Sequence, residues 1–513
     1  MTKIIALVFV LISQSQAARI LAVFPVPSIS HQVVFRPLTQ ELAKRGHQVV
    51  VVTPDPAFPK DKTPANLTEI DTHDISYTKW KELYKLSSTA DNNLAAQVMH
   101  SLRMINEIFE TVLNTEAMQK LLQEKFDLLI LEACVRPALT LSYVFKAPVI
   151  QFSSLGPMEY NAEIIGAPIH PLLYPSVFRQ KLYNLTYWEK INEVWNVFRV
   201  NQEINSLEHL EDEMAQRNFG PDIPSISELK KNVHMLFLNV HPIWDSNRPV
   251  PPSVVYMGGL HQNPAKELPE DLKNYLDSSK NGVIYMSLGT NVKPSLLPPD
   301  KIKLILRVFS QLPYDVLLKW DTDAFPERAA NIRVTKWVPQ SDMLRHPKIK
   351  LFITQGGLQS TDEAITAGVP LIGIPMLGDQ WFNVERYVHH QIGLRLDIGT
   401  LTEEQLSEAI NTVINDESYR GNVVRLRGLM RDQPQRPLER AVWWTEHALR
   451  HGGAAHLRAP AANMPWTEYL ELELVLILLG IVTSVLSFFA FVLYTIWKFV
   501  FQNLTVRMKV KST

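Results

Sequence analysis

The sequence predicts an α/β protein made of two βαβ domains that face a cleft, followed by one helix that crosses a membrane. Short apolar runs alternate with helical patterns in both halves of the chain. Residues 352–380 read as a strand, a glycine turn, a helix and a second strand, and residues 474–497 are a continuous apolar run. At 513 residues, the chain is long enough to form two hydrophobic cores.

The N-terminal residues predict a signal peptide followed by a βαβ unit. Residues 1–17 combine a lysine, an apolar core and a small-residue exit, which is typical of a cleaved secretory signal. Strands are expected at 19–25 and 48–53, with a loop and a helix between them. That loop contains no glycine, so the dinucleotide fingerprint is absent, which argues against a dehydrogenase. His31 lies where the loop meets the helix, as either a capping residue or a catalytic base.

An acidic residue follows the third expected strand. Residues 126–131 read FDLLIL, a strand pattern that is apolar except for Asp127, and Glu132 comes directly after it. The carboxyl ends of strands in open α/β sheets face the ligand crevice, so we expect Glu132 to lie there. Residues 156–175 are rich in proline, aromatic and aliphatic side chains. A segment this apolar is covered by the core, by a membrane surface or by an apolar ligand.

The second half of the chain contains a candidate anion site. Gly356 and Gly357 end a buried strand and open a helix. A helix N-terminus offers free backbone N–H groups and a positive dipole end, which suits phosphate. The segment Asp321-Thr322-Asp323 has the form of a DxD metal motif but lies away from this turn. We interpret it as a solvated turn and predict no metal.

The C-terminal apolar run predicts a membrane anchor. At 1.5 Å rise, the roughly 24 residues of 474–497 span the hydrocarbon core. Acidic residues precede this run and basic residues follow it, so residues 498–513 are expected in the cytosol and the bulk of the chain in the lumen. The terminal letters KVKST resemble a dilysine retrieval signal and favour the endoplasmic reticulum. The sequons at Asn66 and Asn184 would then face the lumen.

Composition excludes other classes of function. A net charge of −1 gives no electrostatic case for nucleic acid as a partner. The single cysteine, Cys134, excludes an internal disulfide framework and a multi-cysteine zinc site. We expect Cys134 to be a small core residue beside a strand.

Several motifs, in order along the chain, are similar to those of the UDP-glycosyltransferase family. They are MGGLH at 257–261, SLGT at 287–290, WVPQ at 337–340, TQGG through DQ at 354–380, and the segment from DQPQ to HLR at 432–458. The resemblance covers nearly the whole chain and implies the GT-B fold. It also implies an acceptor-binding domain at 18–240, a linker at 241–280, a UDP-sugar-binding domain at 281–435, and return helices with a stalk at 436–473.

The resemblance also implies residue roles. His31 would be the catalytic base and Glu132, where the family usually has Asp, its partner. Trp337 would stack on uracil, although a core tryptophan is the alternative. The other donor-binding residues would serve the base and ribose (Gln340, Glu363), the diphosphate (Ser287, Thr290, Gln355, Gly356, Gly357, Gln359) and the sugar (Asp379, Gln380).

Together these observations predict an inverting glycosyltransferase that moves a hexosyl group to the hydroxyl of a small lipophilic acceptor. The expected donor is UDP-glucose and the product a β-glycoside, for detoxification or metabolite conjugation. The alternatives are the same fold acting on a dedicated endogenous lipid or hormone, and a non-catalytic nucleotide-sugar-binding membrane protein. No cofactor is expected, and a homo-oligomer is left open. Gln355 replaces a family histidine, so donor affinity is expected to be flat between about pH 5.5 and 8.

Overall fold

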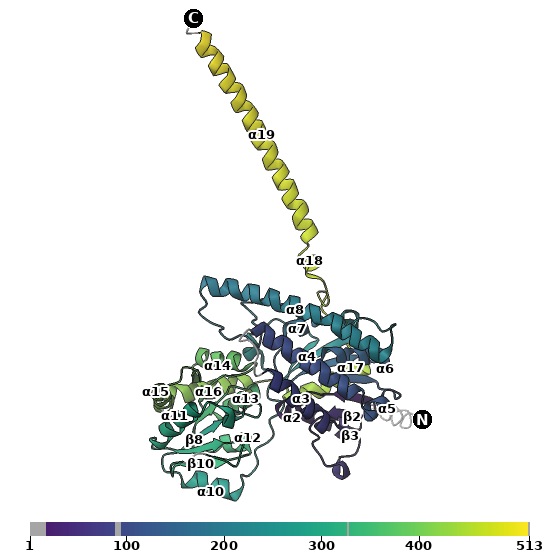
Figure 1. The fold of residues 1–513 in the computed structure, drawn as a ribbon. Coiled ribbons are helices and arrows are strands. Elements are labelled where there is room, and N and C mark those ends of the chain that lie inside the picture. The colour runs from purple at the N-terminus through teal and green to yellow at the C-terminus, as the bar shows by residue number, and fades with distance from the viewer. Residues whose placement is uncertain (1–16, 88–93, 326–327, 511–513) are drawn as a thin grey trace, which may run out of the picture. The chain divides into compact units, whose positions relative to one another are not determined.

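A computed structural model describes residues 17–87, 94–325 and 328–510 (Figure 1). The chain divides after Ala459 into two compact units, a large α/β unit and a C-terminal unit. Apart from Ala17, the predicted signal peptide lies outside the described residues.

The first half of the large unit contains a seven-stranded parallel sheet in the order β3-β2-β1-β4-β5-β6-β7. Its strands are β1 (Arg19–Val23), β2 (Gln48–Thr53), β3 (Leu67–Asp71), β4 (Leu128–Glu132), β5 (Val149–Ser153), β6 (Val233–Leu238) and β7 (Val254–Tyr256). Its helices are α2 (Ile29–Lys44), α3 (His73–Ser87), α4 (Leu94–Leu113), α5 (Glu116–Leu121), α6 (Thr140–Phe145), α7 (Glu159–Ile165), α8 (Tyr187–Phe219) and α9 (Ile226–Leu229), with 3-10 turns η1 (Lys60–Lys62), η2 (Arg136–Leu139), η3 (Lys230–Asn232) and η4 (Pro242–Asp245).

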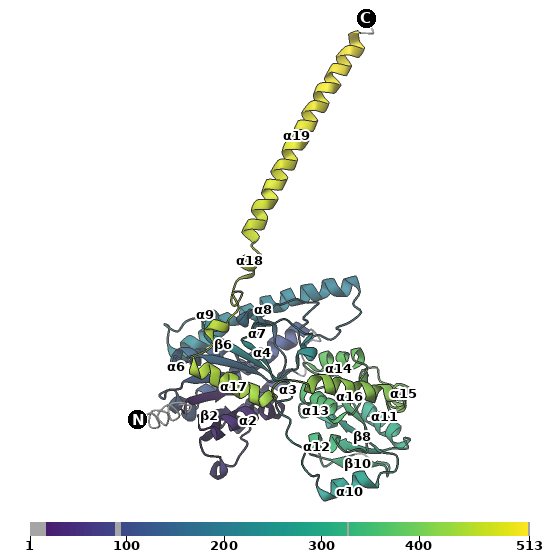
Figure 2. The ribbon, with the colours of Figure 1, turned by 180° about the vertical axis from the view of Figure 1, so that it is seen from behind.

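Helices cover both faces of this sheet because its strands are apolar on both sides. In β1, Ile20 and Ala22 pack in one core with α2, whereas Leu21 and Val23 pack in another with α4. The C-terminal helix α17 (Pro437–Arg450) contacts α2 and β7, and its apolar residues join the α2 core (Figure 2). Helix α17 therefore packs against elements of the first sheet.

The second half contains a six-stranded parallel sheet in the order β10-β9-β8-β11-β12-β13. Its strands are β8 (Val283–Ser287), β9 (Asp315–Lys319), β10 (Ile332–Thr335), β11 (Ile349–Thr354), β12 (Leu371–Gly373) and β13 (Gly393–Arg395). The helices are α10 (Glu270–Ser278), α11 (Pro299–Ser310), α12 (Gln340–Leu344), α13 (Leu358–Ala367), α14 (Gln380–His389), α15 (Glu403–Asn415) and α16 (Glu417–Arg431), with 3-10 turns η5 (Pro294–Leu296) and η6 (Ala455–Leu457). Two such doubly wound sheets confirm the predicted GT-B fold class.

The expected linker contains more structure than the sequence suggests. Strand β7 pairs in parallel with β6, so the first sheet extends into residues 241–280, and α10 also lies there. The proline- and glycine-rich composition of this region hides a strand of three residues. The first sheet therefore extends beyond residue 240.

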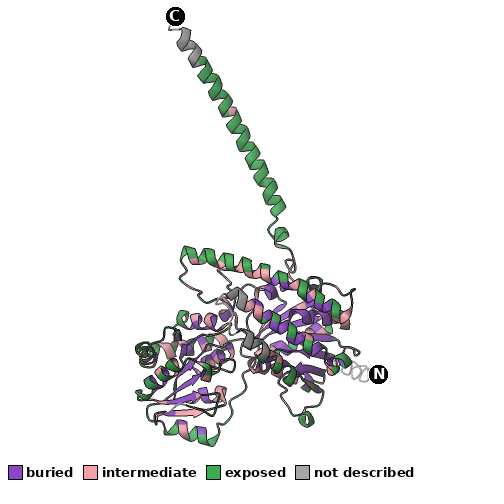
Figure 3. Ribbon diagram, in the orientation of Figure 1, coloured by how far each residue is buried: buried purple, intermediate pink, exposed green. Residues whose placement is uncertain are grey.

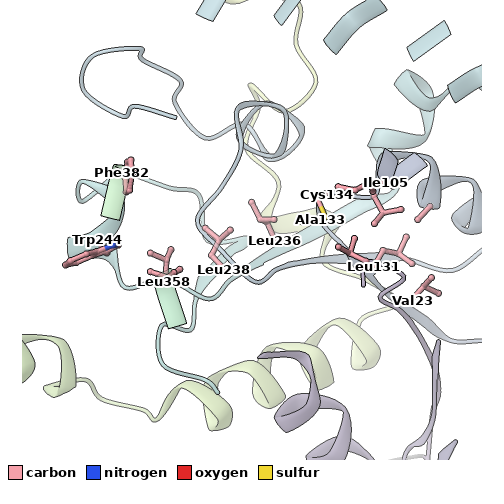
Figure 4. Close-up of a cluster of buried hydrophobic side chains, with 14 of the residues drawn as sticks. Val23, Ile105, Leu131, Ala133, Cys134, Leu236, Leu238, Trp244, Leu358 and Phe382 are labelled. Carbon is pink, nitrogen blue, oxygen red and sulfur yellow. The ribbon is translucent and has the colours of Figure 1, made fainter. Parts of the chain in front are cut away.

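One apolar core joins the two halves of the large unit (Figure 4). It runs from β1 and β4 through β6 to Trp244, and on to Leu358 of α13 and Phe382 of α14. Helix α7, within the apolar segment 156–175, is part of this core, whereas Leu173 nearby is exposed. Core packing therefore accounts for the first part of that segment.

Helix α8 presents an apolar face that the described residues do not cover (Figure 3). Its first three turns expose Tyr187, Trp188, Ile191, Trp195 and Phe198, each by half or more. These residues recur at helical spacing and therefore lie on one side of the helix.

The C-terminal unit contains α18 (Trp466–Tyr469) and α19 (Leu472–Val510). Within α19, Leu472–Asn503 is long and apolar enough to cross a membrane, with a mean hydropathy of 2.7 and no buried residues in its most apolar window. This agrees with the predicted span at 474–497, although the helix continues through much of the predicted cytosolic tail.

Candidate active site

His31 lies in the first turn of α2, where the proline-containing loop after β1 ends. Its backbone N–H donates to the carbonyl of Ser28 at 2.9 Å. Its Nδ1 lies 2.7 Å from Oε1 of Glu132, and its side chain is 20% exposed. Nδ1 is therefore engaged, and no hydrogen bond to Nε2 occurs among the described residues. A carboxylate on Nδ1 favours the tautomer whose Nε2 is free to accept a proton.

Glu132 is the last residue of β4 and its side chain is only 2% exposed. Its second oxygen, Oε2, accepts from the backbone N–H of Val26 at 3.3 Å. Both oxygens thus have a partner in the loop–helix segment that carries the imidazole. The family usually has Asp at this position, and the longer Glu132 side chain also reaches His31.

Cys134 joins these two residues in a group whose potential ligand atoms lie within 4.8 Å of one another. Burial raises the pKa of the Cys134 thiol, and the charge of Glu132 raises it further. A thiol that stays protonated is a poor metal ligand. Cys134 is buried, as expected of a core residue. The absence of a metal from the mechanism stays a prediction.

The DxD-like segment is held by neighbouring side chains. Asp321 accepts from the N–H and the hydroxyl of Ser295 at 2.9 and 2.6 Å. Asp323 pairs with Lys336 at 2.6 Å. These contacts agree with the interpretation as a solvated turn.

The glycine turn connects β11 to the N-terminus of α13. Gly356 has φ +94°, and a Cβ there would lie 2.5 Å from Cγ2 of Val384, so only glycine fits. Gln355 is buried beside Gly289 of the SLGT loop, where a Cβ would lie 2.1 Å from the Gln355 amide nitrogen. The two predicted phosphate loops are therefore adjacent. Thr290, the last residue of the SLGT loop, is exposed.

Lys319 is a residue of this region that the sequence motifs missed. It ends β9, donates from Nζ to the carbonyl of Gly289 at 3.0 Å, and lies 4.5 Å from the ring centre of Trp337. Burial lowers its pKa. Trp337 itself is 64% exposed, which excludes the core alternative and leaves ring surface for a base to stack on.

Gln340 and Glu363 form the predicted ribose end of the site. The Gln340 amide donates to Oε2 of Glu363 at 2.7 Å and to the hydroxyl of Ser360 at 3.0 Å. Its oxygen accepts from the hydroxyl of Tyr285 at 3.1 Å. Burial raises the pKa of Glu363 to about 7, and the Gln340 hydrogen bond opposes this shift. Next to Glu363, Asp362 lines a cleft of about 550 Å³, and its Oδ2 has no partner among the described residues.

Asp379 and Gln380 differ in what they contact. Burial raises the pKa of Asp379 to about 6, opposed first by a hydrogen bond from Asn383 and also by an electrostatic interaction with His31. His31 of the first domain and Asp379 of the second are therefore close enough to interact electrostatically. The side-chain Oε1 of Gln380 accepts from the backbone N–H groups of Met376 and Leu377 at 2.8 Å each, so only the side-chain amide nitrogen remains for the sugar contact predicted from the sequence.

Asn383 organises the contact between the two domains. Its amide donates to Asp379 and to the carbonyl of Gly356, both at 2.8 Å, and its oxygen accepts from the indole N–H of Trp244 at 2.8 Å. Its position one helical turn after Asp379 was the available signal for this residue. Gln359, predicted to bind the donor, donates to the carbonyl of Ser154 in the first domain at 3.1 Å.

The family model described as UDP-glucoronosyl and UDP-glucosyl transferase matches residues 19–510, and the chain belongs to this family. It is accordingly a UDP-glycosyltransferase. It is 39% identical over 487 residues to an ecdysteroid UDP-glucosyltransferase of Spodoptera littoralis nuclear polyhedrosis virus, covering 90% of this chain and 94% of the relative. It is 32% identical over 488 residues to UDP-glucosyltransferase 2 of Dactylopius coccus, covering 93% and 92%.

A mammalian relative and solved structures complete the comparison. UDP-glucuronosyltransferase 2B14 of Oryctolagus cuniculus is 31% identical over 492 residues, covering 91% of this chain and 90% of that one. The kitacinnamycin glycotransferase structure has a TM-score of 0.56 at 20% identity, covering 85% of this chain and 99% of that chain. The spinosyn forosaminyltransferase SpnP has a TM-score of 0.56 at 18% identity, covering 85% and 100%. These structures show the fold alone.

Proposed function

We propose that the chain transfers glucose from UDP-glucose to a hydroxyl group of a small lipophilic acceptor, with inversion at the anomeric carbon. The observation that carries the proposal is the 2.7 Å contact between His31 Nδ1 and Glu132, with Asp379 of the donor domain nearby. This arrangement combines an oriented base with a carboxylate suited to sugar hydroxyls. Several of the similar relatives are named UDP-glucosyltransferases, which supports glucose as the sugar.

The proposed reaction is a single displacement. Nε2 of His31 takes the proton of the acceptor hydroxyl while its oxygen forms a bond to the anomeric carbon. The bond from that carbon to the diphosphate breaks, and UDP leaves. The carboxylate of Glu132 stabilises the imidazolium that results. Attack opposite the leaving group converts an α-linked donor into a β-glycoside.

The donor would be held along the glycine turn. Backbone N–H groups at the start of α13 and the hydroxyl of Ser287 would face the diphosphate. The ring of Trp337 would stack on uracil, and Glu363 would accept the ribose hydroxyls as charge-assisted hydrogen bonds. Asp379 and the Gln380 amide would contact the sugar. Helix dipole and side-chain donors would thus take the place of a cation.

The same proposal places the enzyme in the endoplasmic reticulum membrane, with the large unit in the lumen and residues 498–513 in the cytosol. The candidate span Leu472–Asn503 and the basic residues after it support this orientation. The aromatic and aliphatic face of α8 suits an enzyme whose acceptors partition into lipid.

A dedicated steroid acceptor is a second candidate. Three relatives at 35–40% identity are named ecdysteroid UDP-glucosyltransferases, which favours a polyhydroxylated steroid over a broad set of phenols. Apolar pockets discriminate weakly between acceptors, so only an assay separates the two.

The experiment is a transfer assay with the full chain in detergent. UDP-[¹⁴C]glucose is offered with a panel of phenols, aliphatic alcohols and ecdysteroids, and the anomeric configuration of the product is read by NMR. We expect β-glucoside, and a turnover reduced about 10²–10⁴-fold in His31→Ala with UDP binding retained. An α-linked product, or undiminished turnover in His31→Ala, would refute the mechanism. Turnover with UDP-glucuronate alone would refute the choice of sugar.

A further inference from the structure

Three histidines that the proposed reaction does not use lie close together on the first domain. His447 and His451 are one turn apart at the end of α17, and His456 lies in η6. The ring centres of His447 and His451 are 4.5 Å apart, those of His447 and His456 5.4 Å, and those of His451 and His456 5.8 Å. His451 and His456 are exposed, so the cluster is open to solvent.

Two of the rings already have the separation of ligands on one metal ion. Nε2 of His447 lies 3.3 Å from Nε2 of His456. Two nitrogens bound to one tetrahedral zinc at about 2.0–2.1 Å lie roughly 3.3–3.4 Å apart. His451 stands four residues after His447, the spacing at which two histidines of one helix face can share a metal. Because His451 is exposed, its ring can rotate towards the other two.

The surroundings of His447 favour the neutral form of its ring. Burial lowers the pKa of His447, and the neighbouring His451, His456 and Arg450 lower it further. A neutral imidazole is the ligand form. Arg450 opposes a bound cation, but it lies within 3.8 Å of Glu446, whose charge offsets it.

The turn that carries His456 is fixed to the first sheet. Ala454 donates its N–H to Nδ1 of His234 in β6 at 2.9 Å. Gly453 has φ +113°, and a Cβ there would lie 2.0 Å from the same nitrogen. Arg458, just after the turn, donates to the carbonyls of Lys231 and Ile164. His456 is therefore held against α17, so less conformational freedom is lost when a ligand binds there.

We propose that His447, His451 and His456 form a binding site for one divalent transition-metal ion, with water completing a tetrahedral shell. Imidazole ligands suit Zn²⁺, Cu²⁺ and Ni²⁺. The ion would fasten η6 to α17 at the end of the large unit, and it would take no part in glycosyl transfer. An Nε2 to Nε2 distance of 3.3 Å also fits a hydrogen bond between two neutral rings, and the experiment separates the two readings.

The test uses the full chain, purified in detergent with a tag other than polyhistidine. Zinc chloride is titrated by calorimetry, and copper chloride by tryptophan fluorescence, because the rings of Trp443 and Trp444 lie 5.2 Å from that of His447. We expect one ion per chain, with affinity reduced at least tenfold in His447→Ala and in His456→Ala. His209→Ala, which removes an exposed histidine on α8, is the matched control and should bind as the wild type does.

Three results would overturn the proposal. They are an absence of binding by the wild type, equal affinity in the wild type and His447→Ala, and loss of binding in His31→Ala but not in His447→Ala. The last would assign the metal to the group of His31, Glu132 and Cys134 instead. The melting temperature adds a second readout, because zinc should raise it in the wild type and not in His447→Ala.

Discussion

The affinity for UDP-glucose should increase as pH rises from 6 to 8. The sequence suggested a flat profile because Gln355 carries no titrating group, but that expectation considered only the phosphate contacts. Burial raises the pKa of Glu363 to about 7 and that of Asp379 to about 6. If these carboxylates accept ribose and sugar hydroxyls in their charged form, the form competent to bind becomes more populated as pH rises.

The magnitude follows from the fraction of each group that is ionised. A carboxyl with pKa about 7 is roughly one-tenth ionised at pH 6 and nine-tenths at pH 8. Apparent affinity scales with the competent fraction, so Glu363 contributes about tenfold, which is about 1.4 kcal/mol. Asp379 is about half ionised at pH 6 and contributes about another twofold. The donor keeps its charge across this range, so the change belongs to the protein.

Calorimetric titration of UDP-glucose at several pH values measures this effect. Glu363→Gln should leave only the shallow contribution of Asp379. Gln355→His should add a slope of opposite sign, because an imidazolium beside the diphosphate is lost as pH rises. A wild-type affinity that changes less than twofold between pH 6 and 8 would refute the reasoning. So would an unchanged slope in Glu363→Gln.

Further outcomes test other parts of the site and the topology. Glu132→Gln keeps the shape of the side chain but removes the charge that orients His31, so kcat should fall about 10²–10⁴-fold at unchanged KM for UDP-glucose, and unchanged initial rates would contradict this. Trp337→Ala should weaken UDP binding by about 1–3 kcal/mol in calorimetry, and a loss below twofold would speak against stacking. Asp362→Asn should raise the melting temperature, because burial raises the pKa of Asp362 to about 7 and its Oδ2 has no partner among the described residues. Asp362 ionises near pH 4 in the unfolded chain and only near pH 7 in the folded chain, so the stability of the wild type falls as pH rises between these values. The stability gained by Asp362→Asn, at most about 4 kcal/mol, should therefore appear at pH 8 and vanish near pH 4. Protease added to intact microsomes should remove only the short basic tail, and digestion of the large unit without detergent would overturn the topology.

The fold could be predicted because its signals are local. Continuous apolar runs bounded by glycine and proline identified the buried strands, and doubly covered parallel strands have this pattern. Strand β7 was missed because three residues between a proline-rich segment and a glycine pair give no periodicity to detect. The exposed face of α8 was missed for another reason. Its aromatic residues look like core residues until the structure shows that nothing among the described residues covers them.

The candidate site was predictable in part. His31, Glu132 and the glycine turn each sit at the end of a strand or the start of a helix, and in an open parallel sheet such positions face the ligand crevice. Which partner each side chain takes depends on contacts between distant segments. Gln359 illustrates this, because it sits on the donor helix yet donates to Ser154 of the other domain.

Lys319 shows how the site can compensate for Gln355. A glutamine at that position brings no positive charge to the diphosphate. Lys319 comes from the neighbouring strand β9 and donates to the carbonyl of Gly289, the residue that Gln355 packs against. A cation is therefore present at the phosphate loops although the glycine motif itself carries none. Because burial lowers the pKa of Lys319, an incoming diphosphate would favour its charged form, which stabilises the complex without a histidine.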